Sequence, residues 1–329
     1  MTNLHTEKIS DIAIVIPAFN EELTIAAVVS AFHFELPKAR IIVVDNNSTD
    51  RTADVAMDVF SKLQIKGGVL FEKSKGKSSA IRKAFRCVEA DIYVMVDADM
   101  TYPASSVHAL VAGIYAGNDM VVGNRMAGEV YAKQNERRFH SIGNYAFCTL
   151  VNTLFNGSLL DIFSGYRAFS NLFVKNFPIM STGFAIEAEL SIHALDKRFT
   201  IAELPIEYSQ RTVEGSVSKL NTYRDGVMIM LLIIKLVKDF YPLRFFGALS
   251  IGFFSLSLAS GFPVVDEFLR TAMVAHVPLA ILASALMILS ILCLGVGFIL
   301  DTVACNQRFT FEHALLRTTN KIPSNTSRL

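Results

Sequence analysis

Residues 12–45, IAIVIPAFNEELTIAAVVSAFHFELPKARIIVVD, decide the fold class of this chain. Two short β-branched runs, IAIVI at 12–16 and IIVV at 41–44, each lead into polar residues. Between them, residues 21–34 carry apolar side chains at helical spacing. Continuous apolar runs of this length are typical of strands that are buried on both faces of a parallel sheet. The stretch therefore predicts a strand, a helix and a second, parallel strand.

The same alternation continues along the chain. Further segments follow: a helix at about 78–88, strands at 92–96 and 120–122, a helix at 142–155 and a late strand at 201–208. Pro205 lacks a backbone donor, so the late strand is expected at an edge of the sheet. Alternating strands and helices predict an α/β domain with a mostly parallel sheet, whose ligands bind beyond the carboxyl ends of the strands.

The C-terminal third has a different composition. The chain has 329 residues, of which 52% are hydrophobic, against roughly 45–50% in an average domain. Residues 245–262 and 277–300 contain no Asp, Glu, Lys, Arg or His, and each is as long as the ~17–25 residues that span a bilayer. We expect a soluble domain in 1–216, amphipathic juxtamembrane helices in 217–242, a two-helix transmembrane hairpin in 243–301 and a cytoplasmic tail in 302–329.

Charge predicts the orientation of this hairpin. Basic side chains flank its outer ends: Lys235, Lys238 and Arg244 before it, and Arg308, Arg317, Lys321 and Arg328 after it. The connection between the spans carries Asp266 and Glu267 against Arg270 alone. The excess of basic residues beside cytoplasmic ends predicts a multi-pass protein of the plasma (inner) membrane, with the soluble domain and both termini in the cytoplasm.

Composition also excludes several classes of protein. A net charge of +1 gives no electrostatic reason to expect nucleic acid as a partner. The polar N-terminus, MTNLHTEKIS, does not resemble a signal peptide. The four cysteines show neither CxxC nor metal-ligand spacing, so reduced thiols are expected rather than a disulfide scaffold.

Polar clusters follow three of the predicted strands. Asp97-Ala98-Asp99 places two carboxylates at a strand end, where both can reach Mg²⁺ or Mn²⁺ together with substrate phosphates. The tripeptide is common by chance, and its place after a strand favours metal binding over a solvated turn. Asp45 opens a run of Asn, Ser, Thr and Asp that fits base or ribose recognition or, in its later residues, a helix cap.

A basic turn lies at residues 74–79, SKGKSS. It is not a P-loop, because Phe71 stands where the first glycine of that motif is required. The turn precedes a predicted helix, whose N-terminus can attract an anion.

Nine motifs in order connect these features to a known family. They are IVIPAFNEE (14–22), VVDNNSTDRT (43–52), GKSSAIRKAF (76–85), VDADMTYP (96–103), VVGNR (121–125), DIFSGYRAF (161–169), GFAIEAEL (183–190), PIEYSQR (205–211) and SKLNTYRDG (218–226). With them the chain resembles a family 2 glycosyltransferase of the polyprenyl-phosphate sugar-transferase group, similar to dolichol-phosphate mannose synthases and bacterial undecaprenyl-phosphate glucosyltransferases. The resemblance implies a GT-A-like catalytic domain in 1–216.

The resemblance also implies roles for single residues. The donor nucleotide sugar would be bound by Pro17, Phe19, Glu21, Asp45, Asn46, Lys77, Asp97 and Arg125. Asp97 and Asp99 would hold Mg²⁺ or Mn²⁺ on the diphosphate, and the catalytic set would be Asp161, Asp99 and Arg211. The acceptor phosphate would be bound by Arg138, Arg167 and Lys219. Whether Asp161 orients the acceptor or acts as a base stays open.

Two positions depart from the family pattern. Asn46 stands where a second Asp is common, which bears on base recognition, and Thr101 stands where a Gln is frequent, which bears on a third metal ligand.

The implied reaction is inverting transfer of a sugar, from a UDP-hexose or UDP-N-acetylhexosamine, to undecaprenyl or dolichyl phosphate in the bilayer. A phosphate monoester is largely anionic at neutral pH, since its second pKa is about 6, and so needs little help from a base. A processive polysaccharide synthase is the alternative enzyme, but this chain has no Trp for the acceptor motif of that class and only two spans. A non-catalytic membrane scaffold is the other alternative. Homo-oligomer formation stays open.

Overall fold

The computed structural model describes residues 10–126, 138–179, 186–208 and 234–319. The chain divides into two compact units, Met1–Lys219 and Leu220–Leu329. Each unit is described separately below.

A seven-stranded sheet forms the centre of the first unit, in the order β3-β2-β1-β4-β6-β5-β7. Its strands are β1 (Ile12–Ala18), β2 (Arg40–Asp45), β3 (Gly67–Phe71), β4 (Ile92–Met95), β5 (Met120–Asn124), β6 (Arg167–Ser170) and β7 (Ile201–Pro205). Only β6 runs against its neighbours, pairing antiparallel with both β4 and β5. The predicted α/β fold with a mostly parallel sheet is confirmed, and β7 with Pro205 lies at an edge as expected.

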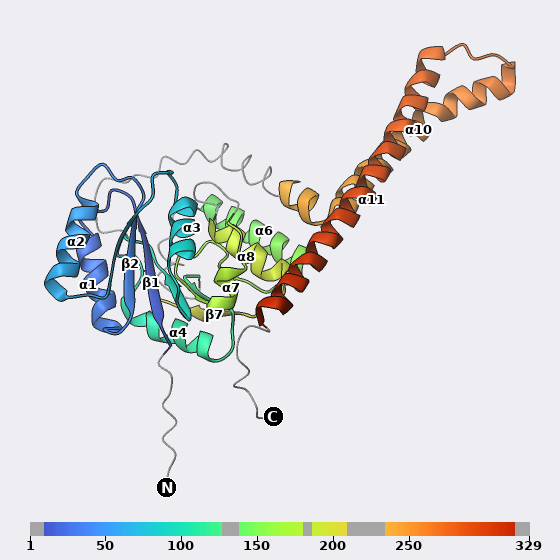
Figure 1. Ribbon diagram of the computed structural model, residues 1–329. Helices are drawn as coiled ribbons and strands as arrows, with labels where there is room; N and C mark the ends of the chain where they lie inside the picture. Colours follow the sequence, from blue (N-terminus) through green and yellow to red (C-terminus); the bar gives the residue numbers. More distant parts are fainter. Residues whose placement is uncertain (1–9, 127–137, 180–185, 209–233, 320–329) are drawn as a thin grey trace, which may run out of the picture. The chain divides into compact units, whose positions relative to one another are not determined.

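Helices cover both faces of this sheet. They are α1 (Ile25–Glu35), α2 (Thr52–Leu63), α3 (Lys77–Cys87), the short η1 (Ala104–Ser106), α4 (Val107–Tyr115), α6 (Arg138–Phe155), α7 (Asn171–Lys175) and α8 (Ile186–Asp196). Figure 1 shows α1 and α2 on one side of β1 and β2, with α3 on the other. Alternate residues of β1, such as Ile14 and Val15, therefore face different helical layers, and both are fully buried. Burial on both faces explains why these strands read as unbroken apolar runs.

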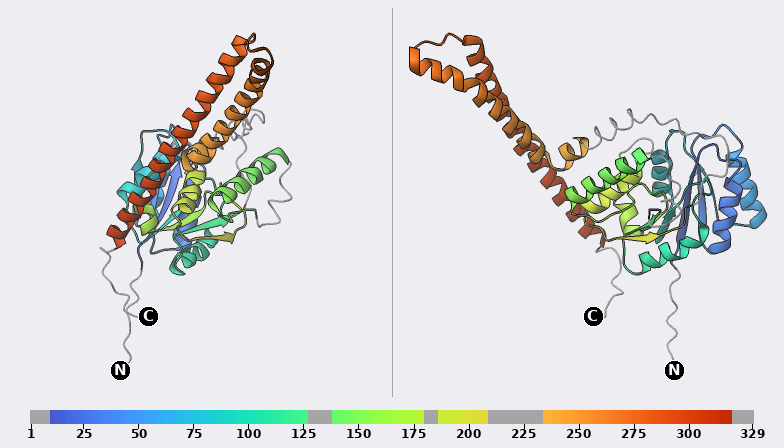
Figure 2. Two further views of the ribbon diagram at one scale, coloured as in Figure 1. Left: turned by 90° about the vertical axis from the view of Figure 1, so that its right-hand side faces the viewer. Right: turned by 180° about the vertical axis from the view of Figure 1, so that it is seen from behind.

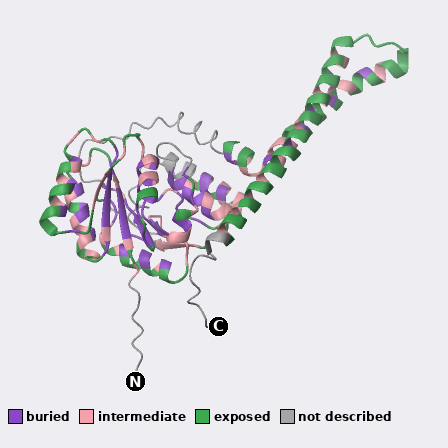
Figure 3. Ribbon diagram, viewed as in Figure 1, coloured by how far each residue is buried: buried purple, intermediate pink, exposed green. Residues whose placement is uncertain are grey.

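The strand register brings three loops together. In the β1–β2 pair, Ala18 lies opposite Asp45, and in the β1–β4 pair, Val15 lies opposite Met95. The polar residues that follow β1, β2 and β4 therefore meet at one edge of the sheet. Figure 3 shows that the strands that lead into these polar residues are largely buried.

The sequence analysis did not predict two of the strands, β3 and β6. β3 is half exposed and contains two glycines, so it lacks an apolar run. β6 has only four residues, and its antiparallel pairing depends on β4 and β5, which lie far away in the sequence.

The second unit contains two long helices, α10 (Pro242–Thr271) and α11 (Val277–Thr319). Figure 2 shows them side by side as a hairpin. Ser250 and Ser290 hydrogen-bond through their hydroxyls at 3.0 Å, and Ser257 Oγ donates to the carbonyl of Ala283 at 2.8 Å. Both helices are long and apolar enough to cross a membrane, and their outer surfaces are largely exposed (Figure 3). This fits the predicted spans at 245–262 and 277–300.

The flanks of the hairpin can be compared with the sequence only in part. Of the expected juxtamembrane helices in 217–242, residues 217–233 lie outside the described residues, and 234–240 are helical. Helix α11 continues to Thr319, so the first part of the expected tail is helical. The guanidinium groups of Arg244 and Arg308 lie 4.8 and 5.7 Å from the centre of the Tyr241 ring. None of the four cysteines, which all lie within the described residues, is paired in a disulfide.

Candidate functional site

A cavity of about 730 Å³ opens beyond the carboxyl ends of β1, β2 and β4. It is lined by Pro17, Ala18, Phe19, Glu21, Asn46, Lys75, Gly76, Lys77, Asp97, Ala98, Asp99, Phe163 and Glu187. Seven of these residues were expected at the site from sequence: Pro17, Phe19, Glu21, Asn46, Lys77, Asp97 and Asp99. The structure brings them together from four separate segments of the chain.

The loops around this cavity adopt unusual backbone conformations. Asn20, Asn47 and Met100, which follow β1, β2 and β4, all have positive φ angles of 56–62°. Asparagine tolerates this left-handed region, but a methionine there carries strain of roughly 1–2 kcal/mol. The first two loops are also tied together, since Asn20 Oδ1 accepts a hydrogen bond from Thr49 N at 2.8 Å. Strain persists where the surrounding structure imposes it, which is common at functional sites.

Lys77, the first residue of α3, lies between two carboxylates in the cavity. Its ammonium forms an ion pair with Asp97 and a second one with Glu187 at 2.6 Å. Burial alone would lower the pKa of this ammonium, but the two carboxylates together raise the pKa above its ordinary value. Lys77 therefore stays charged at neutral pH.

Gly165 makes room for this ion pair. A Cβ atom at this position would stand 2.5 Å from Asp97 Oδ2 and 3.0 Å from Lys77 Nζ. The backbone N of Gly165 donates to the Tyr102 hydroxyl at 2.9 Å, which ties this loop to the loop that follows β4. Burial raises the pKa of Tyr102 to about 12, so this hydroxyl stays neutral.

Asp99 lies at the other end of the Asp-x-Asp tripeptide. Its Oδ1 accepts hydrogen bonds from the backbone N of Thr101 at 3.2 Å and from the Thr101 hydroxyl at 2.6 Å. Thr101 therefore orients this carboxylate. Within the described residues, no group of three or more His, Cys, Asp or Glu side chains is arranged to hold a metal ion. Two carboxylates nevertheless fit Mg²⁺ or Mn²⁺, because such ions commonly take one or two protein carboxylates and complete their shell with water and substrate phosphates.

Asn46 and Asp45, at the end of β2, have different surroundings. The Asn46 amide donates to the carbonyl of Ser74 at 2.7 Å and accepts from the backbone N of Gly76 at 2.6 Å, so it holds the loop before Lys77. An aspartate there could not donate the first of these bonds. Asp45 is 5% exposed, and its Oδ1 has no hydrogen-bond partner among the described residues. A buried carboxylate oxygen without a partner is costly unless a ligand satisfies it.

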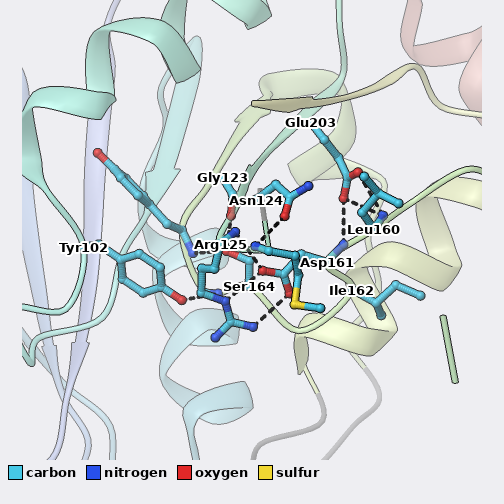
Figure 4. A network of polar contacts seen from close by, with 12 residues as sticks. Tyr102, Gly123, Asn124, Arg125, Leu160, Asp161, Ile162, Ser164 and Glu203 are labelled. Carbon is cyan, nitrogen blue, oxygen red and sulfur yellow. Dashed lines mark hydrogen bonds and ion pairs between the residues drawn. The ribbon is translucent and has the colours of Figure 1, made fainter. Parts of the chain in front are cut away.

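Arg125 and Asp161 form a second polar group outside the lining of this cavity (Figure 4). Asp161 is fully buried, and its two oxygens accept from Arg125 Nε and Nη2, both at 2.8 Å. The backbone N of Arg125 also donates to Asp161 at 3.1 Å. Glu203 of β7 accepts from the backbone N of Leu160 and of Asp161, which holds the loop in place. Asp161 is thus fully engaged by Arg125, whose guanidinium also lies 5.5 Å from the ring centre of Tyr208.

The expected contact of Arg167 with an acceptor phosphate needs correction. Arg167 has no exposed surface, and its guanidinium donates to the carbonyls of Ser164 and Ile162 and to the Ser191 hydroxyl. Burial lowers the pKa of this guanidinium to about 10, but the group remains charged at neutral pH. Arg167 joins β6 to the preceding loop and to α8, and no ligand can reach it in this arrangement.

Three predicted residues cannot be placed. Arg211 and Lys219 lie outside the described residues, as does the side chain of Arg138 at the start of α6. Conversely, the structure adds three residues to the site that the sequence analysis did not assign to it: Glu187, Gly165 and Glu203. Glu187 and Gly165 belong to two of the motifs that carry the family resemblance, GFAIEAEL and DIFSGYRAF, whereas nothing in the sequence marked Glu203.

The sequence of this unit matches a known family. Residues 13–175 match the profile of Glycosyl transferase family 2. The chain belongs to this family. The resemblance found in the sequence is thereby confirmed.

Relatives of this family 2 glycosyltransferase extend the comparison. The chain is 28% identical to the glycosyltransferase AglJ of Haloferax volcanii over 300 residues, which is 90% of this chain and 95% of AglJ. It is 27% identical to a dolichyl-phosphate hexose transferase of the same organism over 226 residues, 68% of this chain and 93% of the relative. The crystal structure of glucosyl-3-phosphoglycerate synthase from Mycobacterium tuberculosis aligns with 70% of this chain and 79% of its own, with a TM-score of 0.54 and 22% identity. This likeness supports the GT-A-like fold.

Proposed function

We propose that this chain transfers a sugar from a nucleotide sugar to a polyprenyl phosphate, with inversion at the anomeric carbon and release of a nucleoside diphosphate. One observation carries the proposal: a single cavity contains the Asp-x-Asp carboxylates, a buried lysine and an aromatic ring at the ends of three parallel strands. Open α/β sheets bind ligands at this edge. Carboxylates and a cation together match a metal-bound diphosphate.

The donor would be a UDP-hexose or UDP-N-acetylhexosamine. Phe19, 47% exposed at the cavity, offers a surface for a base or ribose. The buried Asp45 Oδ1 would accept a hydrogen bond from the nucleoside. The synthase from M. tuberculosis was solved with Mn²⁺ and UDP-glucose, which supports this class of donor for the same fold.

Asp97 and Asp99 would hold Mg²⁺ or Mn²⁺. When bound there, the ion would neutralise charge on the departing diphosphate. Lys77 would add positive charge on the same side of the cavity. Asn46 would hold the loop that presents Lys77.

The acceptor would be a lipid phosphate such as undecaprenyl or dolichyl phosphate. Kinship with a dolichyl-phosphate hexose transferase supports this class. The α10–α11 hairpin would cross the membrane with both ends in the cytoplasm and keep the enzyme beside its lipid acceptor.

Because the acceptor phosphate is already anionic, cations rather than a base would direct it. These would be Arg125 and, outside the described residues, the side chains of Arg138, Arg211 and Lys219. Asp161 would be a positioning residue that holds Arg125.

A mass-resolved transfer assay tests this function. The full-length protein is offered UDP- and GDP-sugars with undecaprenyl phosphate and Mg²⁺ or Mn²⁺, and the lipid product is identified by mass. We expect a monophosphate lipid that carries one sugar. If the lipid remains unmodified with every donor, the proposal is wrong.

Asp99→Ala is the matched variant for the metal assignment. Loss of a metal-binding carboxylate removes charge neutralisation from the leaving group, so transfer is expected to fall by at least about 10³-fold while thermal stability stays near wild type. Turnover at the wild-type rate by a folded Asp99→Ala protein would contradict the assignment.

A further inference from the structure

The Lys77 ammonium lies where a divalent cation would have to compete with it. It pairs with Asp97, one of the two carboxylates proposed to hold the metal, and with Glu187 on the other side. The side chains of Lys77 and Glu187 are each 10% exposed, whereas that of Asp97 is 29% exposed. A positive group is therefore already present on the metal-binding carboxylate.

The surrounding structure keeps this ammonium in place. Lys77 begins α3, and the preceding loop is fixed by the Asn46 amide, which donates to the carbonyl of Ser74 and accepts from the backbone N of Gly76. A Cβ atom at Gly165 would stand 2.5 Å from Asp97 Oδ2, so a side chain there would force the carboxylate to move. Glu187 comes from α8, 110 residues away in the sequence, and gives the ammonium a second partner. Lys77 can thus leave Asp97 without leaving the cavity.

We propose that Lys77 is a built-in counter-cation that suppresses metal binding in the empty enzyme and couples entry of the metal to entry of the diphosphate. In the empty cavity, the ammonium neutralises Asp97 and repels a divalent ion. When a nucleoside diphosphate enters, its oxygens and Glu187 share the ammonium, and Asp97 becomes available to the metal. This inference rests on the proposed function, because it takes Asp97 and Asp99 as the metal ligands.

This arrangement has a thermodynamic consequence. Coupling between two ligands is reciprocal, so a diphosphate that tightens metal binding is itself bound more tightly in the presence of metal by the same factor. The cavity would bind the complete metal–donor pair and hold either part alone weakly.

Mn²⁺ titration monitored by electron paramagnetic resonance tests the coupling without relying on turnover. Full-length protein in detergent is titrated with Mn²⁺, with and without UDP, for wild type, Lys77→Met and Lys75→Met. Lys75 is the matched control, since it lines the same cavity from the same loop and is exposed. Lys77→Met is expected to bind Mn²⁺ alone about ten-fold more tightly than wild type and to lose most of the gain caused by UDP. Lys75→Met is expected to change either value by less than about three-fold.

A second variant is expected to change the affinity for Mn²⁺ in the opposite direction. In Glu187→Gln the ammonium loses its alternative partner and stays on Asp97, so Mn²⁺ alone should bind about three- to ten-fold more weakly than in wild type. This variant tests the inference even if Lys77→Met does not fold.

Different outcomes separate this inference from the proposed function. If wild type binds Mn²⁺ but Lys77→Met binds it no more tightly, or if Lys75→Met tightens it equally, the counter-cation is excluded and the proposed transfer is unaffected. If wild type binds no Mn²⁺ even with UDP, or if sugar transfer proceeds undiminished in excess EDTA, the metal assignment fails and this inference fails with it.

Discussion

At the scale of single residues, the sequence identified the acids at the strand ends, because their position depends only on the strand that precedes them. Asp97, Asp99 and Asp45 all lie where the local pattern put them. The roles of Arg167 and Asp161 could not be read in the same way. Their partners are set by tertiary packing, which places Arg167 in the interior and joins both Asp161 oxygens to Arg125.

The pairing of Asp161 with Arg125 predicts the behaviour of Asp161→Asn. Removing the charge of one partner from a buried pair typically costs about 3–5 kcal/mol, so we expect a clear loss of thermal stability. Transfer should fall by at least about 100-fold, because Arg125 is no longer held in place. The informative measurement is the pH dependence of kcat/KM for the remaining activity. The acidic limb of this pH profile should match that of wild type. If the acidic limb were missing in Asp161→Asn, Asp161 would be identified as the general base.

At the scale of elements, short segments were harder to predict than long ones. Helices α3 and α6 follow from their apolar periodicity, but β6 spans only Arg167–Ser170 and is a strand because two neighbours pair with it. The same long-range packing determines the environment of α8. There His193 lies with its ring centre 4.9 Å from that of Phe177 and 5.9 Å from those of Phe173 and Phe199.

His193 makes the first unit sensitive to acid. Burial lowers the pKa of His193 from 6.5 to about 4, with the nearby Lys197 acting in the same direction. The unfolded chain therefore binds a proton more readily than the folded one. The contribution of His193 to the free energy of unfolding should therefore be fully present above about pH 7.5 and be lost as the pH falls from 6.5 towards 4, by up to about 3 kcal/mol. Denaturant titrations of wild type and His193→Leu at pH 7.5, 5.5 and 4.5 measure this contribution. An equal loss in both proteins would assign the acid sensitivity to other groups.

At the scale of the whole molecule, composition alone separated the chain into a sheet-forming part and a hairpin of two long helices. The charge-free runs marked the hairpin because a bilayer span requires an uninterrupted length of apolar residues. The sequence did not indicate that α11 would continue well past the apolar run, to Thr319.

Removing residues 243–329 tests what the hairpin contributes. The first unit has its own sheet and core, so the truncated protein should keep wild-type affinity for the nucleotide sugar, measured by calorimetry. Transfer to undecaprenyl phosphate in vesicles should fall by at least about ten-fold, because the enzyme is no longer concentrated at the bilayer. A ten-carbon isoprenyl phosphate in free solution serves as control substrate and should be used as well as by the full chain. Undiminished transfer to the long-chain lipid would show that the hairpin is dispensable.

The continuity of α11 has one further consequence. Its 43 residues form a single rod, about 65 Å long at 1.5 Å per residue, in which every residue also advances the direction of a side chain by about 100°. The hydrogen bond from Arg308 Nη2 to the carbonyl of Phe240, 3.1 Å long, therefore fixes the angular phase of the rod against the helical stretch that precedes α10. One alanine inserted between Leu300 and Arg308 would swing that guanidinium roughly a quarter-turn away, whereas an insertion of seven would nearly restore its bearing.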